Sequence, residues 1–264
     1  MREKLKALSN WVRIFGLDPR RFVNSARALP EYLANLRRYK QQVKGAPGLF
    51  PVVSLFPCLH EKYEASGCAR GQYFHHDLLV ARRIFEARPA RHLDVGSRVD
   101  GFVAHVASFR PIEVLDIRPM SATAPNITFV QCDLIGELPS RLVECCDSLS
   151  SLNALEHFGL GRYGDPIRAD GHLLGLRNMH RLLKPRGTMY LAVPIGTQGV
   201  AFDAHRIFSL RYLLDIVQPL FEVKHYSFID DRGDLHDGVE LTPELVNGNC
   251  GCKFGCAVIE AVKR

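Results

Sequence analysis

The chain has 264 residues, 47% of them hydrophobic, and carries a formal net charge of +6 at pH 7. That length is enough for one domain with a sizeable core and an appendage, and no apolar run approaches the ~20 residues of a membrane-spanning helix. Because the charged N-terminus is not followed by the ~7–15 apolar residues of a signal peptide, we expect a cytoplasmic protein with free thiols.

Residues 1–45 are predicted to form a basic helical appendage. They hold 11 Lys and Arg residues against 3 Asp and Glu residues, whereas the remainder of the chain holds 23 against 25, so the positive charge is concentrated in this segment. Asp18 and Pro19 are typical of a helix start, and Pro30 is expected to interrupt or restart the helical pattern. The apolar residues that recur at helical spacing are Trp11, Ile14, Phe15, Phe22, Tyr32, Leu33, Leu36 and Tyr39.

The basic segment is compatible with several partners. A positive helix face attracts anionic surfaces, so residues 1–45 are candidates for peripheral contact with the inner membrane face, for contact with a glycosyltransferase, or for docking on the main domain. A solvated helix face is the simplest alternative. We expect no nucleic-acid partner.

Residues 46–74 are predicted to be a linker or a lid. Glycine and proline at 45–48 break the helical pattern, and the apolar run that follows indicates a lid or a strand at the edge of the domain. That run contains Phe50, Val52, Val53, Leu55 and Phe56.

Residues 75–264 alternate between helical and strand-like runs, which predicts a mostly parallel sheet with helices on both faces. The expected helices are 76–86, 101–109, 173–183 and 210–220, and the expected strands are 92–95, 113–117, 127–132, 147–155, 188–194, 223–229 and 256–262. The run Lys184-Pro185-Arg186-Gly187 is expected to be the turn that ends the third helix. Two strands near the C-terminus predict an antiparallel edge, so the predicted fold class is α/β and Rossmann-like, with a seven-stranded sheet and an N-terminal helical appendage.

Acidic residues lie at the ends of three successive predicted strands. Asp94 lies near the end of the first strand, two residues before Gly96, Asp116 lies 20 residues beyond Gly96 near the end of the second, and Asp133 follows the third. In open α/β sheets, ligands bind at the carboxyl ends of the strands. Glycine there lets a ligand approach the backbone, and an acidic residue at this spacing meets a ribose diol. The combination predicts a nucleoside-binding site.

The segment Asp94-Val95-Gly96-Ser97 resembles the first motif of class I methyltransferases, and residues 182–188 resemble the turn before their fifth strand. The resemblance covers residues 75–264 and implies S-adenosylmethionine as the cofactor. Asp116 resembles the residue that holds the cofactor ribose, and Asp133 resembles the one that pairs with the adenine amine. The cofactor-binding residues that we expect are Asp94, Gly96, Ser97, Arg98, Asp116, Ile117, Asp133, Leu134 and Asn153.

Longer motifs resemble a bacterial family of uncharacterised, methyltransferase-like proteins that is often linked to surface-polysaccharide gene clusters. These motifs are Tyr73–Asp77, Asp94–Phe102, Ser148–Leu152, Glu156–Pro166 and Ala204–Arg206. The association suggests a sugar or polysaccharide precursor as the methyl acceptor, and the family brings no settled activity with it.

Arg98 departs from the methyltransferase pattern, which has glycine at this position. Its side chain could crowd the cofactor, pair with the carboxylate of the methionine moiety, or select a phosphate-bearing ligand. The first possibility motivates a second hypothesis, a non-catalytic nucleoside-binding or scaffold protein in a surface-glycan pathway. An NAD-dependent enzyme is disfavoured because the Gly-x-Gly-x-x-Gly fingerprint is absent from the loop.

Two histidines follow strands on the same expected rim and are the candidate bases for an oxygen or nitrogen acceptor. His157 comes after the fourth strand, with Glu156 or Asp165 as its orienting group or as an alternative base, and His205 comes after the fifth. A structural role in the loop is the alternative for each. The expected acceptor-binding residues are Arg162, Tyr163 and Arg206, of which Arg206 would hold an anionic group or fix the loop by a salt bridge.

Three cysteines near the C-terminus, Cys250, Cys252 and Cys256, raise the question of a zinc site. Their spacings differ from the usual paired Cys-x-x-Cys ligands, and Cys256 begins an apolar strand, where a buried thiol behaves as a small hydrophobe. We therefore expect no metal.

Overall fold

The computed structural model describes residues 16, 18–46, 48–65, 67–120 and 123–264. The chain divides into two units, Met1–Cys68 and Ala69–Arg264, so the predicted linker at 46–74 is shared between them. In the described ranges, no helix combines the length and the apolar character needed to cross a membrane. The apolar positions Trp11, Ile14 and Phe15 lie outside the described residues.

The first unit contains helix α2 (Pro19–Val43) and a returning segment with the short helix η1 (Glu61–Tyr63). The predicted start of α2 is confirmed, because the side chain of Asp18 accepts hydrogen bonds from the first amides of the helix. The predicted interruption at Pro30 is wrong, since α2 continues through it. A proline removes a single amide donor, and the turns on either side keep their own hydrogen bonds.

The returning segment is attached to α2 by side chains. The hydroxyl of Tyr39 donates to the carbonyl of Phe50 at 2.8 Å, and Lys62 forms an ion pair with Glu31. The apolar run at 50–56 is largely exposed and has no strand structure, so the predicted edge strand is wrong there.

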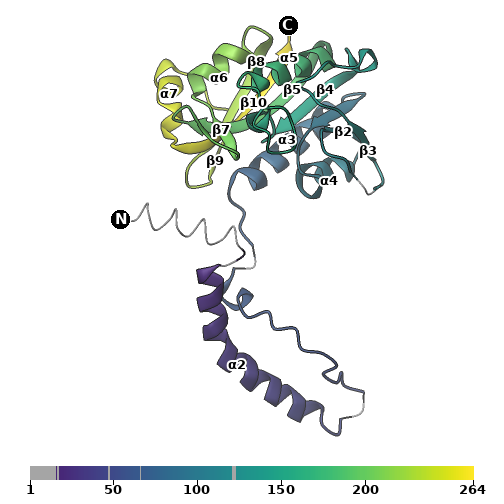
Figure 1. The fold of residues 1–264 in the computed structure, drawn as a ribbon, viewed down its shortest axis with the longest axis vertical. Helices are drawn as coiled ribbons and strands as arrows, with labels where there is room; N and C mark the ends of the chain where they lie inside the picture. The colour runs from purple at the N-terminus through teal and green to yellow at the C-terminus, as the bar shows by residue number, and fades with distance from the viewer. Residues whose placement is uncertain (1–15, 17, 47, 66, 121–122) are drawn as a thin grey trace. The chain divides into compact units, whose positions relative to one another are not determined.

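The second unit is built on an eight-stranded sheet with the order β3-β2-β1-β4-β5-β10-β8-β9 (Figure 1). The strands from β1 to β5 are parallel, and β10 runs antiparallel between β5 and β8. All seven predicted strands are present, and the two-residue β9 adds an eighth. The strands are β1 (His92–Val95), β2 (Ile112–Asp116), β3 (Ile127–Gln131), β4 (Cys146–Leu152), β5 (Leu183–Gly196), β8 (Phe221–Ile229), β9 (Leu235–His236) and β10 (Phe254–Lys263).

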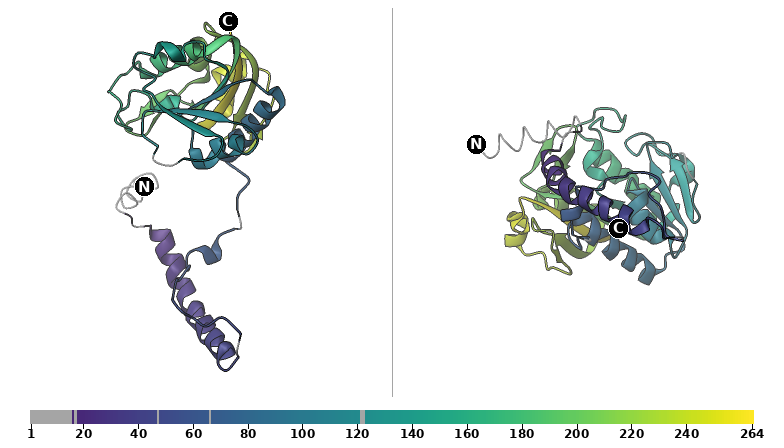
Figure 2. Two further views of the ribbon diagram at one scale, coloured as in Figure 1. Left: turned by 90° about the vertical axis from the view of Figure 1, so that its right-hand side faces the viewer. Right: turned by 90° about the horizontal axis from the view of Figure 1, so that it is seen from below.

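Helices cover both faces of the sheet, as predicted (Figures 1 and 2). One apolar cluster joins the sheet to α5 (Gly171–Leu182) and α6 (Leu210–Val217). A second cluster, on the opposite face, joins it to α3 (Gln72–Ala87) and to the turn η2 (Val99–Val103), which continues into α4. The remaining elements are α4 (Ala104–Ala107), η3 (Ser140–Leu142), η4 (Leu155–His157), β6 (Gly199–Ala201), β7 (His205–Ile207), α7 (Pro243–Asn247) and η5 (Asn249–Gly251).

The predicted turn at residues 184–187 is a bulge inside β5. Leu183 pairs with Cys146, and the next pair along the ladder joins Thr188 to Ser148. The intervening residues have no partners on β4, and Arg186 adopts a left-handed backbone with φ of 62°. The strand therefore starts where the sequence predicts the end of a helix.

The carboxyl ends of β1 to β5 lie at one rim of the sheet. The strand order reverses between β1 and β4, since β2 and β3 lie on one side of β1 and β4 and β5 on the other. Ligands of open α/β sheets bind at such a switch point, so the topology selects this rim as the place of the functional site.

Candidate active site

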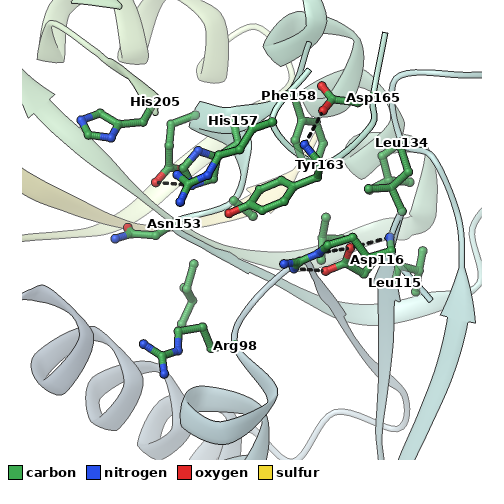
Figure 3. Close-up of a pocket in the computed structure, with 18 of the residues that line it drawn as sticks. Arg98, Leu115, Asp116, Leu134, Asn153, His157, Phe158, Tyr163, Asp165 and His205 are labelled. Carbon is green, nitrogen blue, oxygen red and sulfur yellow. Dashed lines mark hydrogen bonds and ion pairs between the residues drawn. The ribbon is translucent and has the colours of Figure 1, made fainter. Parts of the chain in front are cut away.

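A cavity of about 480 Å³ lies at this rim (Figure 3), within the ~300–1,000 Å³ typical of small-molecule sites. The structure brings most of the predicted site residues into its lining, whereas Asp94, Ser97 and Arg206 lie outside it. The predicted residues that line the cavity are Gly96, Arg98, Asp116, Ile117, Asp133, Leu134, Asn153, Glu156, His157, Arg162, Tyr163, Asp165 and His205.

Asp94 and Ser97 shape the loop that follows β1. The amide and the hydroxyl of Ser97 donate to the Asp94 carboxylate at 2.9 and 2.7 Å, and Ser150 donates to it at 2.6 Å. Burial raises the pKa of Asp94 to about 6 against the effect of these donors. Asp94 therefore supports the loop from beneath the cavity.

Gly96 is the glycine that this loop requires. Its φ is 70°, and a Cβ atom at this position would lie 3.0 Å from the Cβ of Ala154. A larger residue would both strain the backbone and push into the start of η4.

The end of β2 carries an acidic residue that is already engaged. Both carboxylate oxygens of Asp116 accept hydrogen bonds from the guanidinium of Arg118, at 2.6 and 3.0 Å, and the Arg118 guanidinium also lies 4.3 Å from the centre of the Tyr163 ring. On the neighbouring strand, Asp133 accepts from the amide of Ile135 at 2.9 Å. Arg118 was not predicted as a site residue, although its position two residues after Asp116 was a usable signal.

Arg98 does not fill the cavity. Its side chain is 63% exposed and forms a bidentate pair with Asp100, at 2.8 and 3.1 Å. The guanidinium carbon lies 5.8 Å from the centre of the Tyr73 ring. The expectation that Arg98 crowds a bound cofactor is therefore not supported by the position of its side chain.

At the end of β4, Asn153 turns the chain toward η4. It adopts φ of 54°, a conformation that Asn tolerates better than most residues, and its side-chain carbonyl accepts from the buried thiol of Cys256 at 3.5 Å. This turn brings Glu156 and His157 to the cavity.

Glu156 and His157 form a pair of neutral groups. The Nδ1 atom of His157 donates to the carbonyl of Ala204 at 2.6 Å, and its Nε2 atom lies 3.8 Å from Oε1 of Glu156. Burial lowers the pKa of His157 to about 4 and raises that of Glu156 to about 8. At neutral pH the imidazole therefore has a free lone pair on Nε2, and the carboxyl carries a proton.

His205 lies near this pair on β7. Its ring centre is 6.5 Å from that of His157 and 5.2 Å from that of Phe254. Burial, and then the charge of Arg162, lower the pKa of His205. The two candidate bases therefore lie at one end of the cavity, and Figure 3 shows Tyr163 between them and Asp116.

Arg206 has a structural role instead of the predicted contact with an acceptor. It is buried, and its two terminal nitrogens donate to main-chain carbonyls of the loop after β4. The nearest of these, on Phe158, accepts at 2.5 Å. Arg206 therefore fixes the loop, which was the alternative expectation, but it does so through main-chain carbonyls and has no salt bridge with a described carboxylate.

Asp165 also organises the loop. Its carboxylate accepts from the amides of Gly159 and Tyr163, at 2.7 and 3.2 Å. Gly159 has φ of 76°, and a Cβ there would lie 2.2 Å from the carbonyl oxygen of Arg168. Because its oxygens serve the main chain, Asp165 is less available than Glu156 to orient His157.

Besides Arg118, the lining residues that sequence reasoning missed include three from the starts of α3 and β10. Gln72 and Tyr73 lie at the start of α3, and Phe254 lies at the start of β10. Tyr73 begins the motif Tyr73–Asp77, which was a usable signal, whereas no local motif marks Gln72 or Phe254. Phe254 reaches the rim because β10 is antiparallel to β5, so that it starts where β5 ends.

The C-terminal cysteines are part of the protein interior. The hydroxyl of Tyr226 lies 3.4 Å from the sulfur of Cys250, and Cys252 and Cys256 are buried. Within the part of the chain that the structure describes, no group of His, Cys, Asp and Glu side chains is arranged to hold a metal ion.

Comparison with known sequences gives limited information. A family model described as a Caenorhabditis protein of unknown function, DUF268, matches residues 131–231, which is less than half of the chain. Curated proteins show no match.

Comparison with solved structures concerns the fold. A proposed sarcosine dimethylglycine methyltransferase from Galdieria sulphuraria superposes with a TM-score of 0.50 at 16% identity, over 70% of this chain and 83% of that chain. The fold of the second unit is that of class I methyltransferases.

Two further structures are similar at lower scores. The N-methyltransferase NodS from Bradyrhizobium japonicum, solved with S-adenosylhomocysteine, gives a TM-score of 0.48 at 10% identity, over 73% and 88% of the two chains. A 1,6-didemethyltoxoflavin-N1-methyltransferase from Burkholderia thailandensis gives 0.46 at 15% identity, over 72% and 78%.

Proposed function

We propose that the unit Ala69–Arg264 binds S-adenosylmethionine and transfers its methyl group to an oxygen or nitrogen atom of a small molecule. The observation that carries the proposal is the convergence of Gly96, Asp116 and Asp133 on one cavity that also contains His157, at the switch point of a methyltransferase fold. The identity of the cofactor is inferred from the methyltransferase fold, which this unit shares with the methyltransferase from Galdieria sulphuraria.

The residues of the cavity fit this cofactor. The missing side chain at Gly96 leaves the backbone open to a ligand, Asp116 can accept a ribose hydroxyl, and Asp133 keeps one carboxylate oxygen free for an amine. Leu115 and Leu134 provide apolar contacts for a purine ring. Arg98 lies near the loop and can meet a carboxylate, because its own pair with Asp100 is exposed.

When bound, the cofactor supplies a methyl group from its sulfonium sulfur, which keeps the electron pair of the broken bond. The protein has to orient the acceptor and take its proton. His157 is suited to this because its Nδ1 atom is committed to Ala204, which leaves Nε2 to accept. The hydrogen bond to Ala204 orients the ring, the Glu156 carboxyl lies 3.8 Å from Nε2 without a hydrogen bond to it, and His205 is the second candidate base.

We propose the methyl acceptor only as a chemical class. A hydroxyl or amino group could approach Nε2 of His157, and a sugar or polysaccharide precursor is the acceptor that the family resemblance suggests. We include nucleotide sugars among the first compounds to assay.

A second candidate is a nucleoside-binding protein without transferase activity. The observation that favours it is the pKa of the candidate base His157, which burial lowers to about 4, so that its imidazole is a weak base for the proton of an acceptor. Both functions require binding of the nucleoside, and only the methyltransferase would also turn over a methyl acceptor.

Isothermal titration with S-adenosylhomocysteine tests the binding step. We expect micromolar affinity for the wild type and a loss of at least about tenfold for Asp116→Asn, because a charged hydrogen bond to the ribose is removed. Asp215→Asn, at an exposed position of α6, is the matched control and should bind like the wild type. If the wild type binds neither S-adenosylhomocysteine nor S-adenosylmethionine, the proposed function is wrong.

A further inference from the structure

A single carbonyl group holds a candidate base and a positive charge side by side. The oxygen of Ala204 accepts from Nδ1 of His157 at 2.6 Å and from Nη1 of Arg162 at 3.0 Å. Because a carbonyl only accepts, both nitrogens must present a hydrogen to it. The free Nε2 atom of His157 and the guanidinium of Arg162 therefore lie within reach of one small ligand.

The charge of Arg162 is unmatched in the cavity. Three arginines line the cavity: Arg98 is paired with Asp100, and Arg118 with Asp116. Arg162 forms no ion pair with any carboxylate among the described residues, and one of its five N–H groups is used by Ala204. The face of the Tyr163 ring lies 5.1 Å from the guanidinium carbon and holds it in place.

The described acidic groups at this end of the cavity form no ion pair with that guanidinium. Asp165 gives its carboxylate oxygens to main-chain amides. His157 and His205 are neutral at pH 7, because burial and the charge of Arg162 lower their pKa values. Glu156 is protonated, because burial raises its pKa. Arg162 is therefore the positively charged group of this set, and it has no carboxylate partner among the described residues.

Glu156 provides an independent sign of a missing ligand. Its side chain is 2% exposed and lines the cavity. Its Oε2 atom has no hydrogen-bond partner in the described part of the chain. Buried polar atoms are nearly always paired in native proteins, so an unpartnered oxygen beside an open cavity points to a hydroxyl or amino group that arrives with a ligand.

We infer that the acceptor is a small anion, whose carboxylate or phosphate group is bound by Arg162 while its hydroxyl or amino group lies between Glu156 and His157. The planar guanidinium fork matches the oxygens of either anion. The inference rests on the proposed function, because it assigns this end of the cavity to the acceptor. It transfers to Arg162 the anion-binding role that the sequence suggested for Arg206.

Glycolate, which carries a carboxylate and one hydroxyl, is the probe for this subsite, and glycolamide is its uncharged counterpart. Side-chain NMR signals of Arg162 and His205 would be followed during titration of the full-length protein. We expect glycolate to shift both signals saturably, and glycolamide to shift them far less. Arg162→Gln should weaken glycolate binding by at least about fivefold, and Arg162→Lys should restore part of the loss, since it keeps the charge without the fork.

Arg168→Gln is the matched control. Arg168 is exposed, pairs with Asp170, and lies outside the cavity lining, so this variant should bind glycolate like the wild type. Equal shifts from glycolate and glycolamide, or unchanged glycolate binding by Arg162→Gln, would overturn the inference.

Titration of the wild type with S-adenosylhomocysteine in the same buffer separates the two proposals. If S-adenosylhomocysteine binds and glycolate does not, the anionic acceptor is wrong and the proposed function stands. If glycolate binds through Arg162 and S-adenosylhomocysteine does not bind, the anion subsite is real and the cofactor assignment fails.

Discussion

The guanidinium of Arg118 forms a bidentate pair with the carboxylate of Asp116 and donates to both of its oxygens, at 2.6 and 3.0 Å. The main-chain amide of Arg118 donates to the same carboxylate at 2.9 Å. A carboxylate has about four lone-pair positions, so Arg118 occupies most of them. A ribose diol can use Asp116 fully only after part of this pair has opened.

Arg118→Gln is therefore expected to strengthen binding of S-adenosylhomocysteine by about three- to tenfold, because the partly exposed pair that must open contributes only ~0–1 kcal/mol or slightly more. Isothermal titration measures the change. The control is Arg168→Gln, which removes an arginine that pairs with its own neighbour Asp170 in the same bidentate way. Weaker binding by Arg118→Gln would show instead that Arg118 stays in place and contacts the nucleoside.

Glu156 should make stability depend on pH in a defined direction. Burial raises its pKa from 4.5 to about 8, so its contribution to stability is fully present below pH 4.5 and is lost as the pH rises through 8. Glu156→Gln has no such proton to lose. The free energy of unfolding of the variant, relative to the wild type, should therefore rise between pH 5 and pH 9 by on the order of a few kcal/mol.

Urea unfolding of both proteins at pH 5, 7 and 9 measures this difference. Glu137→Gln, at an exposed position, is the control and should follow the wild type throughout. If the free energy of unfolding changes with pH in the same way for Glu156→Gln and for the wild type, Glu156 is ionised in the native protein.

Arg206 should matter for stability because it joins the loop after β4 to β7. Its guanidinium donates to four main-chain carbonyls, including those of Phe158 and Arg168. Arg206→Lys leaves several of these acceptors without a partner, since an ammonium group cannot span the fork. We expect a loss of ~2–4 kcal/mol in the free energy of unfolding. Thermal or urea unfolding measures this loss. A change in the free energy of unfolding below ~0.5 kcal/mol, typical of surface positions, would contradict a stabilising role for Arg206.

Helix α2 is the segment to test for membrane contact. Its sequence contains six Lys and Arg residues against one Glu, and Phe22, Leu29 and Leu33 are exposed on it. Basic helices with exposed apolar residues bind anionic lipid surfaces, with about 1 kcal/mol for each basic residue. We expect the full-length protein to sediment with vesicles that contain phosphatidylserine, and not with neutral phosphatidylcholine vesicles.

Reversal of Arg37 and Arg38 to Glu should weaken this sedimentation, and added salt should do the same, because screening shortens the range of the attraction. The same reversal at Arg177 and Arg211, which are exposed on other helices, is the control. If the wild type does not sediment with anionic vesicles at low salt, the membrane proposal is abandoned in favour of a protein partner.

The sequence by itself determined the elements and the rim of the sheet. The seven main strands, the Asp18 cap and the turn at Gly96 follow from short-range patterns, because strand periodicity, capping and a left-handed glycine depend on neighbouring residues. Acidic residues after β2 and β3 could be placed together from sequence, since parallel strands bring their carboxyl ends to one rim. Thirteen predicted residues therefore lie in the cavity lining.

Only the tertiary structure decided what each side chain does at that rim. Arg206 donates to the carbonyl of Phe158, 48 residues away, and Ala204 accepts from Arg162 and from His157, which are 42 and 47 residues away. The ionisation of Glu156 depends on burial by several segments. These are interactions between distant parts of the chain, and no local pattern encodes them, because burial and side-chain direction are set by packing after the strands have come together.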